Sequence, residues 1–283
     1  MELIRAATDA DLPAIAALRR SVGWNVYRWA LLDAMRPPQA RMYVVEDPGG
    51  VMAIGSGIAY GRLGVVGNMV VSAAHRGRGL GRRVLQAVVA FLEERGCSQL
   101  ELYATADGRR LYEHYGFELS GPSVAVSIPR QIAEALPSDG VVTAGAAGDD
   151  LERLASYDAP RFGADRSPIL AAALADPERP VLIASDGAGS IVGYAVLRPD
   201  GTRLGPFVAD QPSVAGALLA TAAPLAPGVE AIGAQLPGKN VGGIGWLEGI
   251  GASVEPWDGH MRRGSGVARR DETIYGNAIG ALG

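Results

Sequence analysis

Three glycines alternate with other residues where an apolar strand leads into a helix. The run Arg76-Gly77-Arg78-Gly79-Leu80-Gly81 follows the apolar stretch Val65–Ser72. Because glycine has no Cβ, the backbone can approach a ligand closely, and the first-turn N–H groups of the helix present the positive end of its dipole. Such a turn can bind phosphate, and Arg82 and Arg83 add charge that favours a ligand with several phosphates. A solvated basic helix start, with glycines used only for turning, remains an alternative.

Two other phosphate-binding motifs fit this run less well. A Walker A loop needs Gly-Lys-Ser/Thr, which is absent, and the dinucleotide fingerprint places its third glycine one position later than Gly81. Glu101 lies about twenty residues beyond the run on the next expected strand, as the ribose-binding acid of a dinucleotide fold would. A nicotinamide dinucleotide enzyme therefore stays open as the less favoured reading, because the run follows a hairpin and not the first strand.

Hydrophobic spacing predicts a mixed α/β order of elements on both sides of a stretch rich in Ala, Gly and Pro at residues 129–148. In the first half, the expected helices cover residues 9–20, 27–35, 79–95 and 109–115, and the expected strands cover 42–46, 52–60, 65–72, 100–105 and 124–128. In the second half, the expected helices start near 149, 213 and 240, and the expected strands cover 181–185, 191–198, 202–208 and 230–236. The second half therefore looks like a diverged copy of the first.

A second motif, Leu111-Tyr112-Glu113-His114-Tyr115-Gly116-Phe117, follows the next expected strand. Together the two motifs resemble the GNAT superfamily of acyl-CoA-dependent N-acetyltransferases, whose pattern is (Arg/Gln)-x-x-Gly-x-Gly and later (Leu/Phe)-Tyr-x-x-x-Gly-Phe. The resemblance covers residues 1 to about 128. It implies an α/β fold with a mixed α+β sheet and acetyl-CoA as the co-substrate.

The second half resembles the degenerate C-terminal domain of tandem GNAT proteins, through residues 162–166, 204–208 and 240–251. It has no glycine-arginine run near Val208 to Val214, where its copy of the motif should fall, so we expect it not to bind CoA. The expected organisation is a catalytic GNAT domain at 1–130, a linker at 131–148 and a degenerate GNAT-like domain at 149–283 that helps to shape the acceptor site.

The resemblance implies roles for particular residues. Acyl-CoA would contact the main chain of the strand before the glycine run and the run itself, which assigns cofactor binding to Met69, Val70, Val71, Arg76, Gly77, Arg78, Gly79, Leu80, Gly81 and Arg82. Tyr112 would be the general acid, since a phenol can protonate a departing thiolate; an aromatic that packs one face of a short helix is the less favoured alternative. Glu101 is a candidate base, alongside Tyr103 or a water, and is otherwise an ordinary strand residue.

Three further residues are candidates for the acceptor site. Trp24 and Asn25 lie between the first two expected helices, a region that walls the acceptor pocket in GNAT proteins, although Trp24 as a core residue explains the sequence equally well. Asp158 can hold an acceptor cation, and Asp165 is an alternative. A structural pairing of Asp165 with Arg166 would also account for this charged segment.

Composition narrows the function classes. A net charge of -4 over 283 residues argues against nucleic-acid binding, and one cysteine with three separated histidines predicts no metal site. No membrane segment or secretory signal is expected, which favours the cytoplasm. The expected partner is a small-molecule amine, and a monomer and a homodimer both remain open. The competing class is a non-enzymatic acyl-CoA sensor or interaction module.

Overall fold

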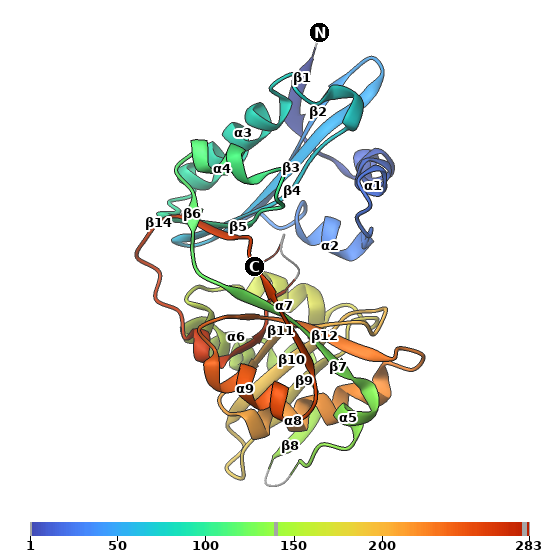
Figure 1. Ribbon diagram of the computed structural model, residues 1–283, viewed down its shortest axis with the longest axis vertical. Coiled ribbons are helices and arrows are strands. Elements are labelled where there is room, and N and C mark those ends of the chain that lie inside the picture. The colour runs from blue at the N-terminus through green and yellow to red at the C-terminus, as the bar shows by residue number, and fades with distance from the viewer. Residues whose placement is uncertain (1, 139–140, 279–281, 283) are drawn as a thin grey trace. The chain divides into compact units, whose positions relative to one another are not determined.

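The computed structural model describes residues 2–138, 141–278 and 282 of the chain (Figure 1). These residues form two compact units, and neither is continuous in sequence. Unit 1 comprises Met1–Ser120, Gly259–Val267 and Ile279–Gly283, and unit 2 comprises Gly121–Asp258 and Ala268–Ala278. None of the helices in the described residues has the length and apolar character needed to cross a bilayer.

Unit 1 is built on a seven-stranded mixed sheet flanked by helices. In sheet order the strands are β1 (Leu3–Ala6), β2 (Ala40–Asp47), β3 (Gly50–Tyr60), β4 (Leu63–Val71), β5 (Gln99–Tyr103), β14 (His260–Gly264) and β6 (Glu118–Leu119). The helices are α1 (Leu12–Ser21), α2 (Arg28–Asp33), α3 (Leu80–Glu94) and α4 (Arg109–His114). Figure 1 shows α3 and α4 on one side of this sheet and α1 and α2 on the other.

Helix α3 forms the core of unit 1 with the sheet. Its apolar residues recur at helical spacing, and among them Val84, Val88 and Leu92 are completely buried. Burying a side chain of this size stabilises a fold by about 1.5–3 kcal/mol. Gly57 on β3 allows the close approach, because a Cβ there would lie 3.1 Å from atoms of both Val88 and Leu92.

Strands β4 and β5 are parallel neighbours that separate along their length. They pair only at Leu63 with Gln99, Gly64 with Leu100 and Val65 with Glu101. On its other edge β4 remains paired with β3 as far as Val71. Within the described residues, the β5-facing edge of β4 beyond Val65 therefore has no strand partner, and its main-chain groups are available to a ligand.

Unit 2 repeats the element order of unit 1. One sheet contains β15 (Ile274–Gly276), β11 (Leu204–Ala209), β10 (Ile191–Leu197), β9 (Val181–Ser185) and β8 (Val142–Gly145), and a second contains β12 (Ala231–Pro237), β7 (Ser123–Pro129) and β13 (Ser253–Trp257). The helices are α5 (Arg130–Glu134), α6 (Leu151–Phe162), α7 (Ser167–Leu174), α8 (Pro212–Ala222) and α9 (Val241–Gly249). The order β8-α6-α7-β9-β10-β11-α8-β12-α9-β13 matches β1-α1-α2-β2-β3-β4-α3-β5-α4-β6, which confirms the expected duplication.

The two repeats exchange their final strands. Strand β7, which follows the first repeat, pairs on both edges within unit 2, with β12 and with β13. Strand β14, which follows the second repeat, lies between β5 and β6 of unit 1. In Figure 1 the red β14 accordingly lies beside strands from the early part of the chain.

This exchange divides the chain differently from the expected boundaries at 130 and 149. Residues 121–130 belong to unit 2, and residues 259–267 belong to unit 1. The expected linker at 131–148 contains most of α5 and all of strand β8, and both elements belong to unit 2. The physical reason is that strand pairing is non-local. The sequence pattern of β7 indicates a strand, but it does not identify the strands with which β7 pairs.

Candidate active site

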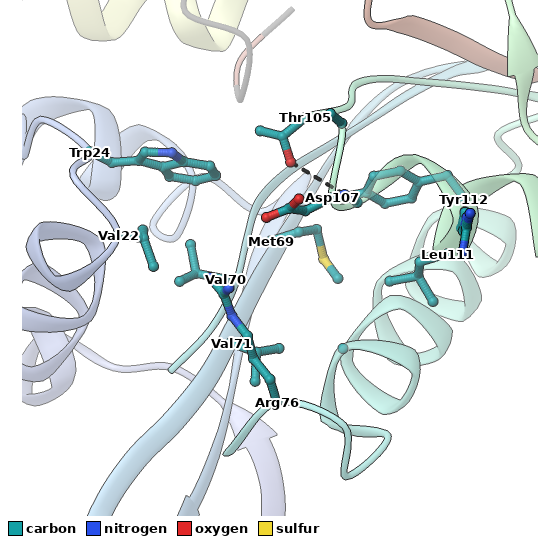
Figure 2. Close-up of a pocket in the computed structure, with 14 residues that line it drawn as sticks. Val22, Trp24, Met69, Val70, Val71, Arg76, Thr105, Asp107, Leu111 and Tyr112 are labelled. Atoms are coloured by element: carbon teal, nitrogen blue, oxygen red, sulfur yellow. Dashed lines mark hydrogen bonds between the residues drawn. The ribbon is translucent and has the colours of Figure 1, made fainter. Parts of the chain in front are cut away.

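A cavity of about 710 Å³ opens in unit 1 where β4 and β5 separate. Its wall combines the end of β4, the segment after α1, the start of α3, and the loop from β5 into α4 (Figure 2). Among its lining residues are Trp24, Val70, Arg76 and Tyr112. The cavity therefore brings together residues of four regions that the sequence pointed to: the expected acceptor wall, the strand before the glycine run, the glycine run itself and the second motif. Its volume is in the range of small-molecule sites.

The glycine run forms a turn with open space around its backbone. Gly77 and Gly79 both have φ of +77°, and a Cβ on either would meet nothing within 4 Å. Gly79 is the N-cap of α3 and no side chain caps this helix start. The first-turn N–H groups, which have no intrahelical acceptor, are therefore presented outward, as an anion site requires.

The arginines around this turn are not equivalent. Arg78 and Arg83 each donate to a different carboxylate oxygen of Glu2, at 2.6 and 2.5 Å. Arg82 donates to the Tyr115 hydroxyl at 3.1 Å, whereas Arg76 lines the cavity. Glu2 thus offsets part of the positive charge, and a phosphate ligand would compete with it for Arg78 and Arg83.

A bulge in β4 changes the direction of the strand beside the cavity. Asn68 sits there with φ of +53°, and its amide donates to the Ser56 hydroxyl at 2.9 Å. Its side-chain oxygen accepts a hydrogen bond from Arg19 of α1. The bulge lies between the β3-paired residues Gly67 and Val70, so it redirects the main chain of Met69 immediately beside the cavity.

Arg19 also holds the segment that carries Trp24. Its guanidinium lies 5.2 Å from the centroid of the Trp24 ring and donates to the Asn25 carbonyl at 2.9 and 3.2 Å. Burial lowers the pKa of Arg19, although an arginine stays charged at neutral pH. The structure places Trp24 in the cavity wall. Asn25 is outside the lining, and its amide instead donates to the Tyr27 hydroxyl at 3.1 Å.

Tyr112 reaches the cavity from α4. The residue is 7% exposed, and its ring packs edge-on against Phe117, with centroids 6.1 Å apart. Burial raises the pKa of Tyr112 to about 12, because desolvation disfavours the phenolate. The hydroxyl therefore keeps its proton at neutral pH and has a proton to donate, although the higher pKa makes it a weaker acid than a free phenol.

Glu101 lies outside the cavity lining, on β5 at the last position paired with β4. Its carboxylate accepts a hydrogen bond from the Gln99 amide at 2.8 Å and lies 3.3 Å from Nε2 of His260. The His260 ring stacks on Tyr103, with centroids 4.9 Å apart. The structure thus places the candidate base in a buried polar cluster and does not bring it to Tyr112.

Several cavity residues were not anticipated from the sequence. Val22, Thr105 and Asp107 all contribute to the lining. Asp107 was not singled out because an Asp-Gly pair after a strand is also an ordinary turn signal. His260 was not anticipated as a partner of Glu101 because 159 residues separate them.

Comparison with protein families matches each half of the chain separately. The description "Acetyltransferase (GNAT) domain" applies to a family model that matches residues 38–119 and to another that matches residues 154–276. The chain is a tandem GNAT acetyltransferase. The expected family, the mixed α/β fold with two tandem domains and the acetyltransferase class are thereby confirmed.

Individual relatives agree with this assignment. An uncharacterized N-acetyltransferase, YitH, of Bacillus subtilis (strain 168) is 28% identical over 214 residues, which cover 75% of this chain and 74% of that protein. A probable glucosamine 6-phosphate N-acetyltransferase of Oryza sativa subsp. japonica is 41% identical over 66 residues, which cover 23% of this chain and 40% of the rice protein.

Solved structures show the same fold over the whole chain. A putative acetyltransferase from Pyrococcus horikoshii has a TM-score of 0.83 at 20% identity, covering 100% of this chain and 96% of the other. A tandem GNAT protein from the clavulanic acid biosynthesis pathway has a TM-score of 0.64 at 14% identity, covering 95% of this chain and 100% of the other.

In this tandem GNAT acetyltransferase, the candidate acceptor residue Asp158 lies outside the cavity lining. The carboxylate is completely buried in unit 2 and accepts hydrogen bonds from Arg166 at 2.7 and 2.8 Å and from the Tyr194 hydroxyl at 2.6 Å. Asp165 does not pair with Arg166. Its carboxylate instead accepts from the backbone N–H of Ser167. Since both oxygens of Asp158 are used inside the unit, Asp158 is a structural group.

Proposed function

We propose that unit 1 transfers the acetyl group of acetyl-CoA to a primary amine of a small molecule, by direct attack within a ternary complex. The observation that supports this most strongly is that one cavity is lined by Arg76 and Gly81 of the glycine run, by the open edge of β4, and by Tyr112 and Trp24. Phosphate, thioester and amine sites must be adjacent for this reaction, because holding the reactants together supplies much of the catalysis.

The glycine turn and β4 would hold acetyl-CoA. First-turn N–H groups of α3 would bind the pyrophosphate, with Arg76 and Arg82 beside them. The pantetheine arm would run along the edge of β4 that β5 leaves open, where main-chain groups of Met69, Val70 and Val71 can bond to it. An N–H there would also polarise the thioester carbonyl as negative charge develops on its oxygen.

Proton transfer completes the reaction. The neutral amine forms a C–N bond to the carbonyl carbon, the C–S bond breaks, and the thiolate takes a proton from the Tyr112 hydroxyl. The proton lost by the attacking nitrogen restores the phenol. Because Glu101 is not part of the lining, a transfer to Glu101 would need a relay such as a water.

A small acceptor is favoured over a macromolecular one. The cavity also has to accommodate the end of the pantetheine arm, which leaves room for a compact amine beside Trp24 and Asp107. The similarity to rice glucosamine 6-phosphate N-acetyltransferases, a probable one at 41% identity and another at 42%, supports a small amine of this kind.

The proposal is tested by incubating the purified chain with acetyl-CoA and a panel of small primary amines and following thiol release. We expect amine-dependent release, and we expect Gly79→Val to abolish acetyl-CoA binding measured by calorimetry, because a β-branched residue strains a φ of +77° and obstructs the turn. Gly61→Val is the matched control for backbone strain, because Gly61 also has positive φ and open space but lies in the turn between β3 and β4, away from the glycine run. Tight CoA binding without turnover on any amine would instead support the sensor alternative.

Tyr112→Phe tests the general acid. Removing the hydroxyl should lower kcat by roughly 100-fold or more while leaving the affinity for acetyl-CoA unchanged, since general acids contribute about 10²–10⁴-fold. Tyr43→Phe, which removes a phenol from β2 away from the cavity, controls for loss of a hydroxyl from unit 1. An unchanged kcat in a folded Tyr112→Phe variant would remove Tyr112 from the mechanism.

A further inference from the structure

The cavity wall carries one carboxylate whose position is not explained by the fold. Asp107 follows β5 in the loop to α4, and its side chain is exposed. Figure 2 shows its oxygens directed across the cavity toward the Trp24 ring. Among the residues that the structure describes, no cation or backbone N–H is bonded to this carboxylate, whereas nearby Glu113 is paired with Arg109 at 2.8 Å.

The charges around Asp107 indicate what it could bind. The charged lining residues are Arg76, Asp107 and Arg110, so Asp107 is the single carboxylate among the described lining residues. Arg76 adjoins the glycine turn and is suited to the phosphates of the co-substrate. Opposite Asp107, the Trp24 ring is fixed by Arg19 and offers a flat aromatic wall. A carboxylate facing an aromatic ring is a combination suited to an alkylammonium group.

We infer that Asp107 and Trp24 form the ammonium subsite of the acceptor, so that the substrate is an aliphatic amine that binds as a cation. This inference rests on the proposed function and specifies its substrate class. Asp107 would hold the ammonium group by a charge-assisted hydrogen bond and orient the nitrogen toward the thioester bound along β4. Before the attack the ammonium group releases one proton to solvent, which reaches the exposed Asp107, so the carboxylate itself acts in binding and orientation.

The test compares two nucleophiles of similar size, a cationic alkylamine and an arylamine that is neutral at pH 7, with wild type and Asp107→Asn. We expect the variant to raise KM for the alkylamine by roughly 10- to 100-fold, since a hydrogen bond to a charged group is lost. KM for the arylamine and for acetyl-CoA should change less than threefold. Glu94→Gln, at an exposed position on α3 outside the lining, is the matched control.

Each outcome separates the subsite from the reaction itself. Turnover of both amines by wild type supports the proposed function independently of Asp107. Equal loss for both amines in Asp107→Asn, or no loss for either, would overturn the ammonium subsite while leaving the acetyltransferase intact. Absence of turnover by wild type with either amine would overturn both.

Unit 2 carries an independent observation on its own strand gap. Strands β11 and β12 correspond to β4 and β5, and in the described part of the chain their pairing is limited to a parallel bridge between Arg203, just before β11, and Gly233. Beyond it, β15 occupies the open edge of β11, pairing Gly276 with Phe207 and Ile274 with Val208. The next residue, Asn277, donates its backbone N–H to the Gln235 carbonyl of β12 at 2.8 Å. One short segment therefore bonds to both sides of the gap.

The segment is fitted closely to that position. Ile274 and Tyr275 are each 2% exposed, and the Asn240 amide donates to the Ile274 carbonyl at 2.9 Å. Gly276 leaves no room for a side chain, since a Cβ would lie 2.8 Å from the Leu204 carbonyl oxygen. An extended peptide here makes main-chain hydrogen bonds of the kind that the pantetheine arm would make along β4.

The entrance to this gap differs as well. The connection from β11 to α8 has Pro212 at the first helical position, which removes one outward N–H. Asp210 places a carboxylate beside it, where Arg161 and the Tyr157 hydroxyl donate to it at 2.7 to 3.1 Å. A negative group and a missing donor both disfavour phosphate.

We infer that β15 permanently fills the gap in unit 2 that corresponds to the acyl-CoA site of unit 1. Unit 2 therefore does not bind the co-substrate. Hydrogen exchange on the full chain tests this by comparing the peptides that contain β15 and β11. We expect both to be protected to a similar degree, with no change at β15 under saturating acetyl-CoA. Rapid exchange of β15 without ligand, or loss of its protection when acetyl-CoA is added, would overturn the inference.

Discussion

The separation of β4 from β5 after Val65 is the constraint on which the proposed active site depends. Buried backbone N–H and C=O groups must find partners, so a strand edge that its neighbour abandons must be satisfied by water, by another segment or by a ligand. In unit 1 that edge faces a cavity. The bulge at Asn68, anchored by Arg19 and Ser56, sets the direction of the strand there. The same Arg19 positions Trp24, so one half-buried guanidinium connects the co-substrate strand with the acceptor wall.

The two repeats satisfy the open edge of the corresponding strand in different ways. Both repeats contain a strand gap, because both keep the same order of elements. In unit 1 the gap leads to a glycine turn whose N–H groups face outward, whereas in unit 2 it leads to Asp210 and Pro212 and is filled by β15. The loss of phosphate-binding features and the arrival of an internal strand are consistent with each other, since an edge without a ligand still needs hydrogen-bond partners.

Local chemistry was predictable from the sequence, and long-range pairing was not. The spacing of Gly77 and Gly79 identified the turn before α3, because positive φ and an open backbone are properties that glycine carries wherever it occurs. Strand β14 and its contact between His260 and Glu101 depend on residues far apart in the chain. Arg166 was expected to pair with its neighbour Asp165. It pairs with Asp158, in the helix α6 that precedes it, so the type of interaction was predictable but the partner was not.

The central claim is that backbone amides of the glycine turn and of β4 bind the co-substrate. A titration of the isotopically labelled chain with acetyl-CoA, followed by amide NMR, tests it residue by residue. The account predicts that the amides of residues 69–71 and 77–82 shift with a common saturation curve, while those of residues 208–211, 213 and 214 in unit 2 do not. Saturable shifts at 208–214 with an unchanged spectrum at 77–82 would contradict it.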